Sequence, residues 1–157
     1  MAKINQESIN EVLKKLKSTQ KQVVTETGKA LAKSCAMIQS TAIKSMRDTV
    51  TNPEVTYYSY NKTKPHHPSV AGNPPAVDTG TLRRSITYKV DENKLVGYVG
   101  SVLQNPPYGA YLEFGTTKDG KQIIKPRPWL RPAVKANLEE IKKLFASAVK
   151  VAIYDKR

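Results

Sequence analysis

The stretch Asp78-Thr79-Gly80-Thr81-Leu82-Arg83-Arg84-Ser85-Ile86 decides how this chain is interpreted, and it follows the proline-rich run Gly72-Asn73-Pro74-Pro75-Ala76-Val77. The triplet that opens it can be a catalytic carboxylate in a tight loop, or a turn that starts a strand. In the second case Asp78 accepts hydrogen bonds from backbone amides near Gly80 in an Asx turn, and Gly80 takes a positive φ. Leu82 and Ile86 would then point into the core.

The catalytic interpretation is that of an aspartic protease, in which two carboxylates from two lobes or two subunits share one proton. Asp78 in a homodimer could supply both carboxylates. However, the residue after the glycine is Thr81, followed by Leu-Arg-Arg, where such enzymes normally have Ser or Ala. These enzymes are nearly all strand, whereas this chain begins and ends with helical patterns. The turn explains more of the sequence, with Arg83 or Arg84 facing solvent.

The N-terminal third has the pattern of one long amphipathic helix. Asn5 or Ser8 can cap it, and the span from Ser8 to Arg47 would be roughly 60 Å long as a helix, although a domain of this size has a radius of gyration of only about 15 Å. We therefore expect the helix to break near Gly28 or to project and be covered by self-assembly. The apolar or small residues of its stripe are Ile9, Leu13, Leu16, Val23, Val24, Leu31, Cys35, Ile38, Ala42 and Met46.

The rest of the chain predicts an α+β fold. Residues 49–77 form a long proline-rich connector, and the period then changes to two, which predicts a β-hairpin over 86–101 with its turn at 91–94. The segment 108–114 suits either a short helix or a strand. Pro132 starts a closing helix. We expect a single domain over residues 1–157, with a long N-terminal helix, a central antiparallel hairpin or small sheet, and a long C-terminal helix.

Composition limits the possible functions. Twenty-six Lys and Arg against 13 Asp and Glu give a formal net charge of +13, which favours a polyanionic partner or an acidic protein surface. A basic nucleic-acid-binding protein is therefore an alternative function. The single cysteine, Cys35, cannot form an intramolecular disulfide and suits a small buried position. The N-terminus has no signal-peptide pattern and no apolar run is long enough for a bilayer, so we expect no membrane association.

The sequence has few residues in patterns that support catalysis or metal binding. His66 and His67 are adjacent in the connector and have no Cys, Asp or Glu cluster around them, so a metal site is not expected. There is no Gly-x-Ser-x-Gly segment, no glycine-rich phosphate loop and no zinc spacing. We expect no catalytic residue, no metal and no cofactor.

About thirty residues after the start of the first segment comes 108–116, Tyr-Gly-Ala-Tyr-Leu-Glu-Phe-Gly-Thr, and it is followed by 126–133, Pro-Arg-Pro-Trp-Leu-Arg-Pro-Ala. Glu113 between Leu112 and Phe114 would be costly to bury alone, so we expect a forked ion pair with a guanidinium. The sequence leaves open whether that pair is formed within one subunit or between two. Gly115 suggests a sharp exit from its element. The possible partners of Glu113 are Arg83, Arg84, Arg127 and Arg131.

With these three segments the chain resembles the small tail-component family of tailed bacteriophages, which includes head–tail joining and tail completion proteins. That family carries Pro-x-Asp-Thr-Gly-x-Leu-Arg-x-Ser-Ile, then Tyr-x-x-Tyr-x-Glu-Phe-Gly-Thr, then x-Pro-Phe-Leu-Arg-Pro-Ala before a C-terminal helix. Here they correspond to 75–86, 108–116 and 127–133, in the same order. Trp129 stands where Phe is usual, and the connector before Pro74 is long and contains histidines.

The resemblance implies a virion structural protein without catalysis. It would form a ring of six or twelve copies at the head–tail junction, or neck, between head-closure or connector proteins and the tail tube or tail terminator. DNA would pass through the lumen without sequence recognition, and the chain would reside in the virion after assembly in the host cytoplasm. The candidate structural and interface residues are Asp78, Thr79, Gly80, Leu82, Arg83, Ile86, Tyr111, Glu113, Phe114, Gly115, Trp129, Arg131 and Pro132.

Overall fold

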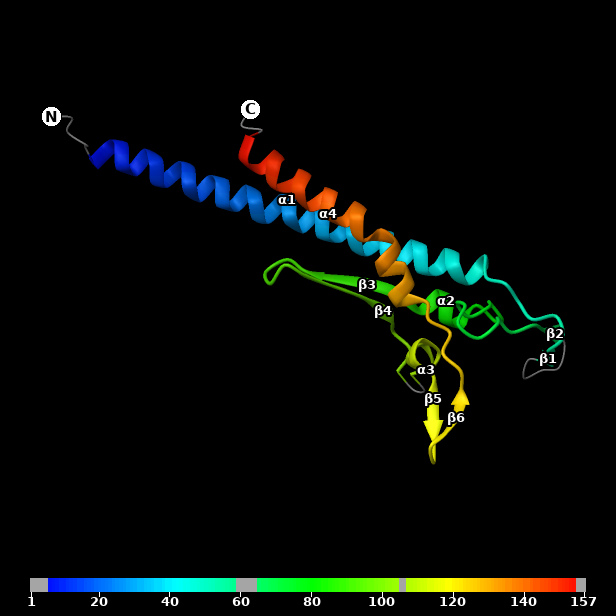
Figure 1. Ribbon diagram of the computed structural model, residues 1–157. Coiled ribbons are helices and arrows are strands. Elements are labelled where there is room, and N and C mark those ends of the chain that lie inside the picture. The colour runs from blue at the N-terminus through cyan, green and yellow to red at the C-terminus, as the bar shows by residue number, and fades with distance from the viewer. Residues whose placement is uncertain (1–5, 59–64, 105–106, 155–157) are drawn as a thin grey trace.

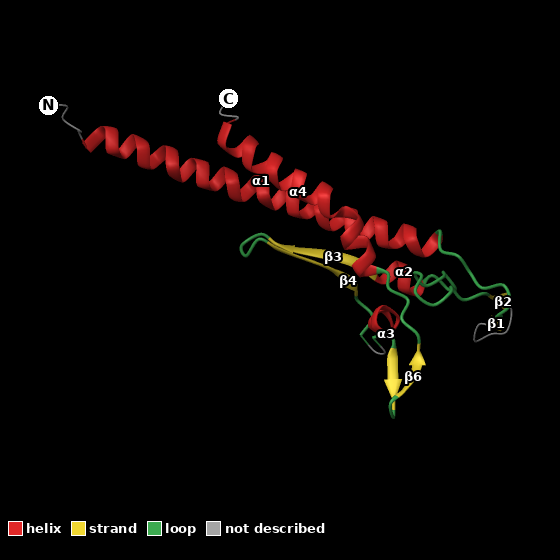
Figure 2. Cartoon of the chain, in the orientation of Figure 1, coloured by secondary structure: helices red, strands yellow, loops and turns green. Residues whose placement is uncertain are grey.

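The computed structural model describes residues 6–58, 65–104 and 107–154. Figure 1 shows a long helix at each end of the chain and short strands between them. The elements in chain order are α1 (Gln6–Arg47), β1 (Tyr57–Tyr58), β2 (Pro65–His66), α2 (Thr81–Ser85), β3 (Ile86–Asp91), β4 (Val96–Ser101), α3 (Tyr108–Phe114), β5 (Thr116–Lys118), β6 (Lys121–Ile124) and α4 (Leu130–Tyr154). The expected α+β class is confirmed (Figure 2).

Helix α1 runs unbroken through all 42 of its residues, which makes it about 63 Å long. Of the two alternatives that its length allowed, the helix projects rather than breaks. Gly28 lies inside it, and a Cβ added there would have no neighbour within 4 Å, so neither a kink nor close packing requires the glycine. Ser8 lies within the helix and is not its cap, while Asn5 lies outside the described residues.

Helices α1 and α4 form an antiparallel pair, in which α1 extends well beyond the end of α4 (Figure 1). Where they meet, the Asn137 side-chain amide donates to Thr41 Oγ1 at 2.9 Å. The first buried residue of α1 is Ala30, so most of the N-terminal half of this helix has no cover within the described chain. The helix is long because its apolar stripe is continuous, but only its C-terminal half packs on the domain.

The hairpin of β3 and β4 runs along α1, below it in the view of Figure 1, whereas the C-terminal part of α4 lies above α1. Its antiparallel register runs from Ile86 opposite Ser101 to Asp91 opposite Val96, close to the expected boundaries. The Gln39 side chain donates to the Ile86 carbonyl at 2.7 Å and ties the hairpin to α1. A side chain at position 97 would collide with the sulfur of Cys35, so Gly97 allows this close approach.

The core lies where the C-terminal half of α1 meets the start of α4, the hairpin and the two short helices. Trp129 is its largest member and is 3% exposed. The other buried residues of the cluster are Ile38, Ala42, Met46, Leu82, Ile86, Leu112 and Ala133. All three motif segments therefore contribute to one core.

The connector between α1 and α2 is held by several backbone contacts. Thr51 forms an isolated antiparallel bridge with Ser69, and Tyr57 pairs with His66 in the β1–β2 ribbon. The Gly72 N–H donates to the Pro126 carbonyl at 2.9 Å, which attaches the connector to the segment before α4. Among the described residues there is no group of three side chains suited to hold a metal ion.

Candidate functional site

The three motif segments meet at the N-terminus of α4. The first supplies α2 and the turn before it, the second is α3 with Gly115, and the third enters α4 through Trp129. The indole N–H of Trp129 donates to the Gly109 carbonyl at 3.0 Å, and the Arg127 N–H donates to the Leu112 carbonyl at 2.7 Å. These bonds fix α3 against the start of α4.

Glu113 caps helix α4 with its side-chain carboxylate. The N–H groups of Trp129 and Leu130 donate to its Oε2 at 2.7 and 2.9 Å, and the N–H of Arg131 donates to its Oε1 at 3.0 Å. The next residue, Pro132, has no N–H to satisfy. One carboxylate therefore accepts hydrogen bonds from all the backbone N–H groups that have no partner within the first turn of α4. Its negative charge also interacts favourably with the positive end of the helix dipole.

The expected ion pair of Glu113 is formed with Arg131 of the same chain, but the guanidinium does not fork onto the carboxylate, because only its Nε bonds a carboxylate oxygen. The Arg131 Nε donates to Glu113 Oε1 at 3.0 Å, and its Nη2 donates to the Glu113 carbonyl at 3.2 Å. The Glu113 side chain is 4% exposed and that of Arg131 is 65% exposed, so the pair lies at the edge of the core. The other three candidate arginines make no salt bridge with Glu113 in the described residues.

Burial on its own raises the pKa of Glu113, but the hydrogen bonds from Leu130, Trp129 and Arg131 outweigh it. The pKa of this carboxyl group is therefore held below its ordinary value. Glu113 is charged under neutral conditions and acts as a structural acceptor.

Phe114 and Tyr111 lie on the outer side of α3. The guanidinium of Arg131 lies 4.9 Å from the centre of the Phe114 ring, a cation–π contact that also orients Arg131 toward Glu113. Phe114 is nevertheless 64% exposed and Tyr111 is 38% exposed. Both aromatic side chains are available for contact with another molecule.

Gly115 ends α3 with φ 74° and ψ 176°, a conformation open essentially to glycine alone. A Cβ at this position would also lie 2.6 Å from the Ile124 carbonyl oxygen of β6. The sharp exit expected from the sequence is thus present, and it turns the chain directly into the β5–β6 ribbon.

The Asp-Thr-Gly segment forms a turn, but its hydrogen bonds differ from the expectation. Gly80 has φ 77°, as expected. The prediction of an Asx turn at Asp78 is wrong. The Asp78 side chain is exposed, and the Thr81 N–H donates instead to Thr79 Oγ1 at 3.3 Å. The hydroxyl oxygen of Thr79 is one bond closer to the backbone than an aspartate oxygen, and it accepts the bond from the amide two residues on, as in an ST turn.

The turn leads into α2 and not directly into the hairpin strand. Leu82 and Ile86 are buried as expected. Between them in the sequence, the hydroxyl of Ser85 lies 2.8 Å from that of Ser101 in β4. Arg84 is exposed and donates to the Thr79 carbonyl at 3.1 Å, whereas Arg83 is half-buried. Of the two alternatives for 108–114, the structure has the helix. One further expectation needs correction, because α4 begins at Leu130, two residues before Pro132.

A cleft of about 940 Å³ lies beside these segments. Asp78, Thr79, Gly80, Leu82 and Arg83 line it from the first motif. Sequence reasoning missed Ser69 and Lys125, which also line it, and named Arg127 only as a possible partner of Glu113, because these residues come from the connector and the segment before α4. Only the proline-rich context of both segments could have indicated them.

A family model described as "Bacteriophage HK97-gp10, putative tail-component" matches residues 2–115, well over half of the 157 residues. The chain belongs to the HK97-gp10-like family. The matched range contains α1 through α3, the first motif segment and all but the last residue of the second in this HK97-gp10-like chain. The resemblance to phage tail components is thereby confirmed.

Neither the curated proteins nor the solved structures contain a significant match to the chain. Within the described ranges, no helix is both long and apolar enough to cross a membrane. Membership of the HK97-gp10-like family therefore supports a structural protein of the phage tail and a location in the virion.

Proposed function

We propose that this protein is a structural subunit that forms a ring at the head–tail junction of a tailed phage. It would join head-closure or connector proteins to the tail tube or tail terminator around the DNA channel. Family membership supports the tail component, and the projecting half of α1 supports the ring. The proposal includes no catalysis, because the polar motif residues hydrogen-bond to the backbone at the start of α4 and in the turn before α2.

The observation that carries the ring is the uncovered apolar stripe on α1. Ile9, Val12, Leu13 and Leu16 recur at steps of three and four, and Val24 lies eight residues further on, so these residues share one face of the helix. A stripe of this length is costly to leave in water, and a neighbouring copy of the chain would cover it. The exposed apolar residues of this half are Ile9, Val12, Leu13, Leu16 and Val24.

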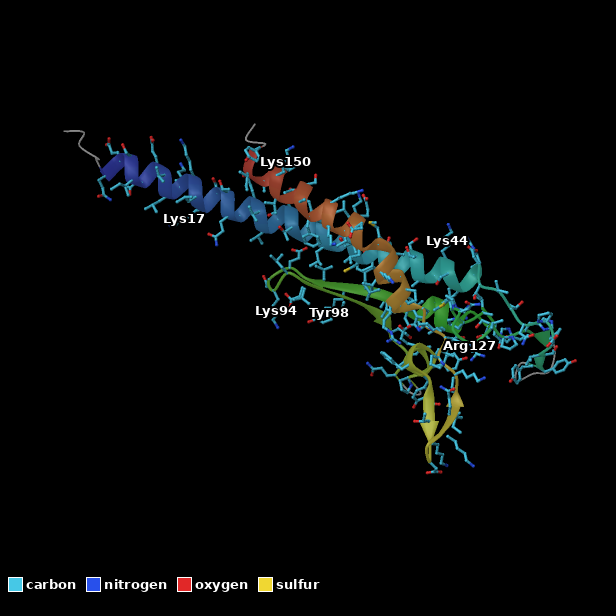
Figure 3. The ribbon with its side chains drawn as sticks, viewed as in Figure 1. Lys17, Lys44, Lys94, Tyr98, Arg127 and Lys150 are labelled. Carbon is cyan, nitrogen blue, oxygen red and sulfur yellow. The ribbon has the colours of Figure 1, made fainter. Side chains whose placement is uncertain are left out.

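The excess of positive charge suits a lumen through which DNA passes without sequence recognition, since phosphate contacts do not depend on base sequence. Figure 3 shows cations on several elements, with Lys17 and Lys44 on α1, Lys94 at the hairpin turn, Arg127 before α4, and Lys150 on α4. We favour six copies in the ring, with twelve as the alternative.

Electron cryo-microscopy of intact particles tests the proposal. We expect density for this chain as a closed ring at the neck, with α1 of one copy against its neighbour and the lumen facing DNA. Density for the chain in the distal tail or outside the virion would contradict it. Particles that keep complete, infectious tails after deletion of the gene would contradict it as well.

A further inference from the structure

The cleft beside α2 has an apolar floor and polar walls. Leu82 of α2, Leu112 of α3 and Met46 of α1 form the floor, and all three are less than a tenth exposed. Connector residues 75–80 border one side, while Ile123, Ile124 and Lys125 border another. With a volume of about 940 Å³, the cleft is large enough for several residues of an extended peptide.

The charged side chains of the cleft are mainly basic. Arg83, Lys125 and Arg127 line it, with Asp78 as the acidic member. No salt bridge among the described residues involves any of these four side chains. An anionic group is therefore favoured here, and a carboxylate matches the fork of an arginine particularly well.

Ser69 supplies a second, independent indication of a ligand. Its residue is 2% exposed, and its hydroxyl is the buried side-chain polar atom without a hydrogen-bond partner in the described part of the chain. Its carbonyl already accepts a bond from Arg127 Nε at 3.2 Å, so the local geometry is fixed. A backbone group of a bound peptide would satisfy the hydroxyl, which is otherwise costly to bury.

Strand β6 offers a free edge at the same cleft. It pairs with β5 on one side in a two-stranded ribbon, and no third strand joins them among the described residues. Ile123 and Ile124 of β6 line the cleft and no residue of β5 does, so β6 is the strand of the ribbon that lies next to the cleft. Unpaired backbone groups on such an edge can accept an added strand.

We propose that this cleft binds an extended acidic segment of a partner protein, which adds a strand to β6. A carboxylate of the segment would pair with Arg83 and Lys125, and an apolar side chain next to it would enter the floor at Leu82 and Leu112. A second copy of this chain is disfavoured as the source by its net charge of +13. A phosphate backbone is disfavoured by the apolar floor.

This inference deepens the proposed function and rests on it, because it names the kind of protein neighbour that a tail subunit would hold. The probe is a short fluorescein-labelled peptide in which glutamate alternates with valine, measured by fluorescence anisotropy with purified full-length protein. We expect it to bind about tenfold more tightly than the same peptide with glutamine in place of glutamate, since charge-assisted hydrogen bonds are lost. Equal affinity for the two peptides would overturn the proposal.

A pair of matched variants locates the site. Arg83→Glu with Lys125→Glu reverses two cations of the cleft, and Lys89→Glu with Lys150→Glu makes the same charge change at exposed positions that do not line it. The first pair should weaken the acidic peptide by about tenfold or more, and the second by much less. Equal losses would show general electrostatic attraction and overturn the proposal. Circular dichroism confirms that both variants fold, and the peptide comparison needs no variant.

Two other occupants are outcomes of the same experiments. A single-stranded DNA oligonucleotide of equal charge that competes fully with the peptide would assign the cleft to nucleic acid. Loss of self-association in the Arg83 and Lys125 variant, with peptide binding unchanged, would assign it to a second copy. Both outcomes overturn the proposal. The particle maps test the ring, and the peptide affinities test the cleft. Either proposal can therefore be contradicted without the other.

Discussion

Glu113 connects two elements that are distant in sequence through a single buried carboxylate. It receives the N–H groups of Trp129, Leu130 and Arg131, and it pairs with the Arg131 side chain. A buried carboxylate is stable only when its oxygens are fully hydrogen-bonded, and this one meets that condition through the start of α4. Glu113 therefore fixes the angle at which the last helix leaves the core.

Replacing Glu113 with Gln should lower the free energy of unfolding by roughly 2 kcal/mol near neutral pH, because an amide cannot accept bonds on both sides. The pKa of Glu113 is below its ordinary value of 4.5, so the carboxylate contributes its full stability above that pH. This contribution is lost as pH falls through the lower folded-state pKa. The difference between wild type and variant should therefore shrink in acid, as measured by urea unfolding at several pH values.

Glu139→Gln is the control for this measurement. Glu139 also pairs with a cation, Lys142 at 2.8 Å, but its side chain is 77% exposed. We expect a change within about 0.5 kcal/mol at every pH, as for most surface ion pairs. A Glu113 variant that behaves like the Glu139 variant would show that the cap contributes nothing to stability.

The ion pair of Glu113 could be predicted from the sequence, but its role as a helix cap could not. An acidic residue between Leu112 and Phe114 needs a cation, which is a local inference. The cap requires backbone N–H groups 16 to 18 residues away in the chain to lie next to Glu113. The packing of Trp129 in the core brings them there. The Asx turn failed for a different reason, since Asp78 and Thr79 are adjacent and either side chain can close such a turn.

At the scale of elements, periodicity predicted the helices and the hairpin well, and the short segments poorly. The apolar stripes of α1 and α4 span many turns, whereas the seven residues of α3 fit both the helical and the strand periodicity. Its helical form is fixed from outside by the bonds of Gly109 and Leu112 to Trp129 and Arg127. The β1–β2 and β5–β6 ribbons likewise depend on contacts that a local pattern does not contain.

The continuity of α1 through Gly28 gives a prediction at this scale. Gly28 has helical neighbours on both sides and open space where a Cβ would lie. Gly28→Ala should therefore raise the free energy of unfolding by about 0.5–1 kcal/mol, by reducing the entropy of the unfolded chain. Thermal unfolding followed by circular dichroism at 222 nm measures it. The comparison is Gly115→Ala, which should destabilise because its φ is 74°.

A lower melting temperature for Gly28→Ala would mean that the glycine is needed, for example because a neighbouring subunit packs closely against it. Repeating the measurement below the concentration at which the protein associates separates these cases. Stabilisation in the monomer together with weaker association would place Gly28 in a subunit contact.

At the scale of the whole molecule, the chain is a small domain with one long projecting helix. The core and all three motif segments gather at one end of α1, while its other end has an apolar stripe and no cover among the described residues. Its length predicted that the helix would either break near Gly28 or project, because a helix of this length exceeds the diameter of a domain this size, and the structure has the projecting helix. The sequence could not predict which surface of a neighbour covers the stripe, since the partner is not encoded in the pattern of one helix.

Assembly through this stripe leads to the final prediction. Leu13 and Leu16 are 48% and 61% exposed on the same face of α1. Replacing both with Glu puts two charges where a neighbouring copy should pack, so the variant should sediment as a monomer at concentrations where the wild type forms a ring. Sedimentation velocity measures this, and circular dichroism checks that the helix persists.

The matched control puts the same two charges on the opposite face of α1, in the next turns of the helix. Ser18→Glu with Gln22→Glu changes the net charge equally, at exposed positions that do not belong to the stripe. Because a solvated face tolerates acidic residues, this variant should assemble like the wild type. Assembly of the Leu13 and Leu16 variant to the same size would remove α1 from the subunit contact. Equal loss in both variants would show that net charge, and not the apolar stripe, governs the association of this chain.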